Sequence, residues 1–175
     1  LYYLTQLSDD AKEEDLREAF IKCAAAETFL SLQYYNSNNV HDTELLDSVI
    51  IPPEFLRYMF YMFGDYRDIC LGTYIHAKTA QGDLEQAKEN IGKVFQKIGP
   101  KTTNGKKVQE REWWWKEYGL SIWEGMLCAL SYNTKTKEMD KDVRTYLMKY
   151  IYKNKDIKDD LEEFASRPPF FRWFI

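Results

Sequence analysis

The sequence lacks the patterns that mark membrane-spanning, metal-binding and nucleotide-binding chains. No apolar run approaches the roughly 20 residues that a membrane-spanning helix requires. Histidine occurs only twice, and neither Glu-x-x-His nor Cys-x-x-Cys is present, which argues against di-iron and zinc sites. Neither the G-x-x-x-x-G-K phosphate loop nor the G-x-G-x-x-G fingerprint occurs. We therefore expect no metal, no cofactor and no direct insertion into a membrane, and we expect any export signal to lie outside this chain.

Catalytic motifs are also missing. A serine-hydrolase elbow reads G-x-S-x-G, whereas residues 119–123 read GLSIW and fail at the last position. His76 could serve as a general base, but a solvated histidine is the more common interpretation. The paired acidic residues Asp9, Asp10, Glu13 and Glu14 stand at an expected helix start, where carboxylates oppose the macrodipole. The sequence therefore predicts no catalytic residues and no enzyme.

The charge balance limits the class of partner. The formal net charge is -4, so the chain has no summed positive field to hold nucleic acid or an anionic membrane. One compact basic group could hold a sulfated glycosaminoglycan: Lys101, Lys106, Lys107 and Arg111. An exposed, lysine-rich loop without a ligand is the alternative interpretation.

The composition is that of a globular chain with much aromatic surface. Of 175 residues, 45% are hydrophobic and 30% charged, and thirteen tyrosines and five tryptophans are present. Helical spacing predicts helices over about 10–35, 42–49, 53–71, 83–98, 110–130 (one helix or two, divided at Gly119), 138–150, 159–165 and 170–174. Only residues 150–152 hint at extended chain. We expect an all-α fold, an irregular multi-helix bundle with polar loops formed by residues 1–175 as one unit.

Several details of the first helix follow from this pattern. Asp10 and Glu13 have the spacing of a capping box, which predicts that the helix begins near Asp10. An apolar stripe is expected to face the core and consists of Leu16, Phe20, Cys23, Leu30 and Tyr34. Glu27 lies in this stripe, so we expect it to have a structural partner such as Arg67, because an unpaired buried carboxylate is costly.

The three cysteines, Cys23, Cys70 and Cys128, leave two interpretations open. One disulfide with one unpaired cysteine fits a piece of a secreted domain. Three reduced, buried cysteines fit a bundle from a reducing compartment, because a free cysteine packs as a small hydrophobe.

Six motifs occur in order along nearly the whole chain. They are AFIKCAAAETF at 19–29, IPPEFLR at 51–57, FGDYRDICLG at 63–72, WWK at 114–116, IWEGMLCAL at 122–130 and RPPFFRWF at 167–174. Together they resemble Duffy-binding-like domains of the erythrocyte membrane protein 1 family of malaria-parasite surface antigens, in particular the central helical subdomain.

The resemblance implies a disulfide-bonded, α-helical adhesion domain without catalysis. Such a domain is displayed on the extracellular face of the infected host-cell membrane, as part of a larger membrane protein. From there it binds a host cell-surface receptor protein on endothelial cells, or a glycosaminoglycan. The resemblance also suggests Cys70 and Cys128 as the retained disulfide, although other pairings remain open. The motif residues read as scaffold, so they do not locate the ligand site.

Several positions depart from the family pattern toward apolar or aromatic residues: Tyr58, Met62, Tyr74, Trp113 and Leu120. Tyr58 and Met62 have i, i+4 spacing, so they are expected to share a helix face. Trp113 and Leu120, at i and i+7, are expected to share another. We predict that these faces converge into an exposed apolar patch that binds a protein, either a natural receptor or a partner for which the domain was engineered. Natural diversity of a variable antigen is the alternative explanation of these departures.

Overall fold

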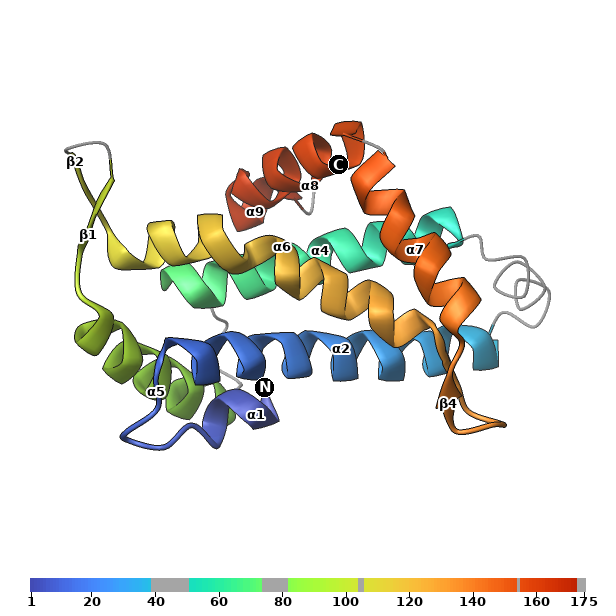
Figure 1. Ribbon diagram of the computed structural model, residues 1–175, viewed down its shortest axis with the longest axis horizontal. Helices are drawn as coiled ribbons and strands as arrows, with labels where there is room; N and C mark the ends of the chain where they lie inside the picture. The colour runs from blue at the N-terminus through green and yellow to red at the C-terminus, as the bar shows by residue number, and fades with distance from the viewer. Residues whose placement is uncertain (39–50, 74–81, 104–105, 154, 173–175) are drawn as a thin grey trace.

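A computed structural model describes residues 1–38, 51–73, 82–103, 106–153 and 155–172, and it confirms the all-α prediction (Figure 1). The helix predicted over 42–49 lies outside these ranges. The described helices are α1 (Tyr2–Thr5), α2 (Glu13–Asn38), α4 (Pro53–Leu71), α5 (Asp83–Ile98), α6 (Glu110–Leu130), α7 (Lys141–Lys153), α8 (Lys155–Ser166) and α9 (Pro169–Arg172).

Two short antiparallel hairpins interrupt the helices, and the sequence did not predict them. The first pairs β1 (Lys101–Thr103) with β2 (Lys106–Val108), in the segment expected to be a polar loop. The second pairs β3 (Tyr132–Asn133) with β4 (Glu138–Met139) between α6 and α7. Residues 150–152, where extended chain was suspected, belong instead to α7, so that prediction is wrong.

Local chemistry explains where several helices begin and end. Pro53 occupies the first turn of α4, and Gly72 ends it in a left-handed conformation with φ 75°. α2 begins at Glu13 rather than Asp10. The Asp10 carboxylate accepts a hydrogen bond of 2.6 Å from the Ser8 hydroxyl, and the Asp15 carboxylate accepts one of 2.8 Å from the Lys12 backbone N–H, directly before the helix. α6 runs through Gly119 as one continuous helix.

The three long helices α2, α4 and α6 lie side by side, and the contact between α2 and α6 is the most extensive. Gly125 of α6 permits this approach, since a Cβ atom there would lie 2.8 Å from Cγ2 of Ile21. α1 and α5 pack together at one side, and α8 packs against α4 (Figure 1).

Aromatic side chains fill the centre of the bundle. Trp114 and Trp123 of α6 are fully buried. The ring of Phe20, from α2, lies 5.2 Å from that of Trp114, and the ring of Phe63, from α4, lies 5.9 Å from that of Trp123. These residues belong to the sequence motifs, so Trp114 and Trp123 are scaffold rather than surface.

Candidate protein-binding surfaces

The C-terminal half of α2 and the first turns of α4 enclose a groove of about 480 Å³, which we call the aromatic groove. Its lining consists of Leu30, Ser31, Tyr34, Tyr35, Asn38, Glu54, Phe55 and Tyr58. Phe55 is buried and forms a fixed floor, with its ring 5.4 Å from that of Tyr35 and 6.3 Å from that of Tyr58. The groove is therefore built on a packed base rather than on a loop.

Large apolar side chains at the rim of this groove are open to solvent. Tyr34 is 75% exposed, Leu30 is 66% exposed and Tyr58 is 46% exposed. Exposed aromatic residues gathered around a hollow supply much of the contact energy when a protein partner covers them. The aromatic groove is thus the best candidate for a protein-binding site among the described residues.

The sequence analysis placed Leu30 and Tyr34 in the buried stripe of α2, and for these two residues it was wrong. Leu16, Phe20 and Cys23 of the same stripe are buried. Toward the end of α2 the buried face turns to Thr28 and Leu32, because the neighbouring helices cross α2 at an angle. A strict helical repeat carries no signal of that crossing, so the groove could not be found from spacing alone.

Of the five residues predicted to form one apolar patch, the four that the structure describes do not come together. Tyr58 lies in the aromatic groove, but Met62 is only 4% exposed and sits 3.9 Å from the Thr28 hydroxyl. Trp113 is half-buried beside Tyr118, at 6.2 Å between rings. α4 and α6 are antiparallel in Figure 1, so the first turns that carry Tyr58 and Trp113 lie at opposite ends of the bundle.

The other two members of the predicted patch, Leu120 and Tyr74, are not among the described residues that line the aromatic groove. Leu120 lines a different hollow, described next. Tyr74 lies outside the described residues. The predicted convergence of the two helix faces therefore has no counterpart in the structure.

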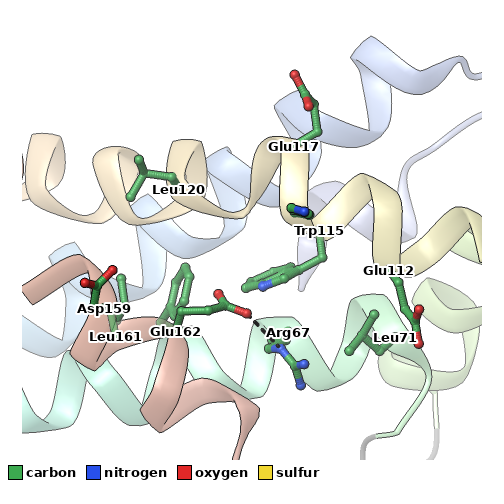
Figure 2. A pocket seen from close by; sticks show the side chains of 11 residues that line it. Arg67, Leu71, Glu112, Trp115, Glu117, Leu120, Asp159, Leu161 and Glu162 are labelled. Atoms are coloured by element: carbon green, nitrogen blue, oxygen red, sulfur yellow. Dashed lines mark ion pairs between the residues drawn. The ribbon is translucent and has the colours of Figure 1, made fainter. Parts of the chain in front are cut away.

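The second hollow lies between α4, α6 and α8 and has a volume of about 630 Å³ (Figure 2); we call it the interhelical pocket. It is lined by Phe63, Arg67, Leu71, Glu112, Trp115, Lys116, Glu117, Leu120, Asp159, Leu161 and Glu162. The Arg67 Nε atom lies 3.8 Å from the Glu162 carboxylate, and Arg67 also donates a hydrogen bond of 3.4 Å to the Ala165 carbonyl. Arg67 thus ties α4 to α8.

The sequence analysis expected Arg67 to be the partner of Glu27, but Arg67 contacts Glu162 and the Ala165 carbonyl instead. Glu27 is exposed, and its carboxylate accepts a hydrogen bond of 2.7 Å from the Tyr66 hydroxyl. Burial and the nearby Glu27 carboxylate raise the pKa of Tyr66 far above its ordinary value, so this hydroxyl remains a donor at any physiological pH. Glu27 is a structural acceptor, as expected, but of tyrosine rather than arginine.

A model of the Duffy binding domain family matches residues 1–168, nearly the whole chain. The chain belongs to the Duffy binding domain family. No curated protein and no solved structure matches it. Duffy binding domains are extracellular, receptor-binding adhesion modules rather than enzymes. The family match confirms the Duffy-binding-like resemblance drawn from the six motifs.

The basic group of this Duffy binding domain is less open than the sequence suggested. Arg111 turns inward, where it donates a hydrogen bond of 2.7 Å to the Cys70 carbonyl and lies 4.7 Å from the centre of the Phe95 ring. The Lys101 ammonium lies 4.7 Å from the centre of the Trp113 ring and 3.8 Å from Glu13. Arg111 is therefore a structural residue.

The remaining two lysines of that group stand on the first hairpin. Lys106 pairs with Thr103 and Lys107 with Thr102 across the two strands. The hairpin thus holds both lysines, together with Lys101, next to the start of α6 (Figure 1).

The three cysteines of this Duffy binding domain are free in the structure, and the predicted Cys70–Cys128 bridge is not formed. Cys70 lies beside Arg111, whose guanidinium contacts its carbonyl. Cys128 stands further along the same continuous helix, roughly 25 Å from Arg111 along the axis. A disulfide requires Cα atoms within about 7 Å, so the antiparallel course of α4 and α6 keeps these two cysteines apart. Burial raises the pKa of the Cys70 thiol, which leaves it protonated and unreactive.

Within the described ranges, no group of three or more metal-ligating side chains comes together. No described helix is long and apolar enough to cross a membrane.

Proposed function

We propose that this Duffy binding domain binds a protein receptor on the host cell surface through the aromatic groove, without catalysis. One observation carries the proposal: Leu30, Tyr34 and Tyr58 are exposed together around a hollow with a fixed aromatic floor. Tyrosine and leucine side chains in such a position bury apolar area without the cost of ordering a loop. The amide and carboxylate groups of Asn38 and Glu54 at the rim can add polar contacts.

A finer assignment rests on the six sequence motifs. They support a domain of the erythrocyte membrane protein 1 type, with residues 1–175 as one helical subdomain, displayed on the extracellular face of the infected host-cell membrane. Binding of an engineered protein partner is the alternative, and it would use the same groove, because Tyr58 is the member of the predicted patch that lies there.

A second candidate function is binding of a sulfated glycosaminoglycan by the first hairpin. The observation that favours it is the register of β1 and β2, which places Lys101, Lys106 and Lys107 on one small ribbon. Two consecutive lysines and a third on the paired strand give a local positive charge on an acidic chain. Arg111 has no part in this candidate site, because it is bound to the end of α4.

Binding of the purified domain to cultured endothelial cells of the host tests both functions. Binding should fall after trypsin treatment of the cells and persist after digestion of their heparan sulfate. The double variant Tyr34→Ser/Tyr58→Ser should lose most binding, whereas Tyr146→Ser, at a 52% exposed tyrosine of α7, should keep it. The opposite result would be loss of binding after heparan sulfate digestion and in Lys106→Glu/Lys107→Glu, with binding retained in the tyrosine variant. That result would overturn receptor binding through the aromatic groove and support glycosaminoglycan binding through the first hairpin.

A further inference from the structure

The interhelical pocket differs chemically from the aromatic groove, because charged side chains surround an apolar floor. In Figure 2 the Glu162 carboxylate projects into the middle of the pocket, and Asp159 and Glu112 lie toward its two ends. Glu117 points away from α4 and α8 in the same view. The floor is apolar and aromatic. Trp115 lies in its middle, with Leu71 toward one end and Leu120 and Leu161 toward the other.

The basic side chains of the lining leave negative charge uncompensated. Arg67 is occupied by Glu162 and by the Ala165 carbonyl. Among the described residues, no basic side chain lies within 4 Å of the Glu112 or Asp159 carboxylate, and both residues are exposed. Lys116 is the remaining base of the lining. The pocket therefore presents the unpaired Glu112 and Asp159 carboxylates, and the Glu162 carboxylate held only at 3.8 Å from Arg67, beside apolar surface. Such a surface is the complement of a long cationic side chain.

A second observation points to the same place. Trp115 is only 4% exposed, and its indole N–H has no acceptor among the described residues. The Nε atom of Arg67 is likewise buried without a hydrogen bond in that part of the chain. Figure 2 shows the Trp115 indole and the Arg67 side chain on either side of the Glu162 carboxylate. The indoles of Trp114 and Trp123 also lack acceptors within the described ranges, but both residues are fully buried in the core. Trp115 and Arg67 instead share the wall of an open pocket, where an acceptor from a bound partner can reach them.

We propose that the interhelical pocket docks an arginine side chain from a loop of a partner protein. The aliphatic stem of that arginine packs on Leu120 and Leu161, and its guanidinium lies between Asp159 and Glu162. A main-chain carbonyl of the same loop accepts a hydrogen bond from the Trp115 indole N–H, which has no acceptor among the described residues. This surface is separate from the aromatic groove, so the proposal does not depend on the proposed receptor site.

Arginine fits this pocket better than lysine for two physical reasons. A planar guanidinium donates to two carboxylates at once in a fixed geometry, whereas an ammonium is a compact, strongly hydrated charge. The partner's hydrogen-bonded guanidinium also loses less solvation in a half-apolar pocket than an ammonium does.

Titration of the whole chain with Nα-acetyl-arginine-methylamide tests the proposal. The readout is the ¹H–¹⁵N resonance of the Trp115 indole, which is assigned by its loss in Trp115→Phe. We expect a saturable shift, and we expect about tenfold weaker binding of the citrulline analogue, which has the same shape without the charge. The lysine analogue should also bind more weakly than the arginine probe.

Two neighbouring carboxylates of α8 provide a matched pair of variants. Glu162→Gln should weaken arginine binding about tenfold. Glu163→Gln, whose carboxylate is bonded to Arg167 at 2.7 Å, should leave it unchanged. Thermal unfolding followed by circular dichroism checks that both variants fold. The absence of a saturable shift, equal binding of arginine and citrulline or of arginine and lysine, or equal effects of the two glutamine variants would each overturn the proposal.

Discussion

The guanidinium of Arg172, on α9, is bonded to the carboxylate of Asp68, on α4, and both residues are almost wholly buried. Arg172 also donates to the carbonyls of Ala165 at 3.0 Å and Arg167 at 2.9 Å. Gly64 gives the guanidinium room, since a Cβ atom at that position would lie 3.0 Å from its Cζ atom. One side chain therefore joins the C-terminal helices to the helix that forms part of both candidate surfaces.

Replacing Arg172 with methionine should destabilise the domain strongly. Arg172→Met leaves the Asp68 carboxylate buried without its cation, and loss of one partner of a buried pair costs about 3–5 kcal/mol. The free energy of unfolding in urea measures this loss. The double variant Asp68→Asn/Arg172→Met should lose clearly less than the sum of the two single changes. A loss below about 1 kcal/mol in the single variant would show that the pair is not important for stability.

A methyl group at Gly125 should also destabilise the domain, for a steric reason. In Gly125→Ala the new Cβ atom meets Ile21 at 2.8 Å, so α2 and α6 must separate, at a cost of about 1–3 kcal/mol. Gly92→Ala is the matched control, because the nearest atom to its Cβ would be 3.8 Å away, in Arg111. Alanine at this helical position should stabilise by about 0.5–1 kcal/mol. Thermal unfolding that moves both variants in the same direction would contradict the close contact.

The carboxyl group of Asp65 should make stability depend on pH. Burial raises its pKa to about 6, although the nearby Arg172 opposes the shift. The folded state therefore holds this proton more tightly than the unfolded chain, whose pKa is near 3.8, and the contribution to stability is lost as pH rises from about 4 to 6. The side chain is 39% exposed, so solvent screening keeps the effect below about 1 kcal/mol.

Asp65→Asn, which mimics the protonated group, isolates this contribution from other titrations. The Tm of the variant relative to the parent should rise between pH 4 and pH 7. Parallel Tm curves for the two proteins across this range would show that Asp65 does not titrate with a raised pKa.

Tyr58 and Met62, which the sequence analysis paired on one exposed face, should respond differently to truncation. Met62→Ala empties a buried position and should cost about 2–5 kcal/mol. Tyr58→Ala removes a half-exposed ring and should cost less than about 1 kcal/mol. Urea unfolding of the two variants measures the difference. Equal losses would mean that both side chains are core, and Tyr58 would then be unsuited to a binding role.

Local signals in the sequence were enough to predict α4 and α5. Proline at the start of α4 and Gly72 at its end gave bounds that agree with the structure, and α5 ends at Ile98 as expected. The hairpins were missed because strands of two or three residues leave almost no alternation to detect.

Arrangements that depend on how helices cross could not be read from one sequence. The exposure of Leu30 and Tyr34, the burial of Met62 and the separation of Cys70 from Cys128 all follow from helix order and direction. The same limit applies to the candidate sites. Tyr58 and Leu120 were predicted to share one patch, whereas Tyr58 lines the aromatic groove and Leu120 lines the interhelical pocket.

Photo-crosslinking on intact endothelial cells tests the receptor proposal most directly. A photoreactive phenylalanine replaces Tyr34 in the aromatic groove or, as a control, Tyr146 on α7, and both positions are more than half exposed. Receptor binding through the groove predicts a light-dependent adduct with a trypsin-sensitive cell-surface protein from position 34, reduced by excess unmodified domain, and none from position 146. Equal adducts from both positions, or an adduct from position 146 alone, would contradict it.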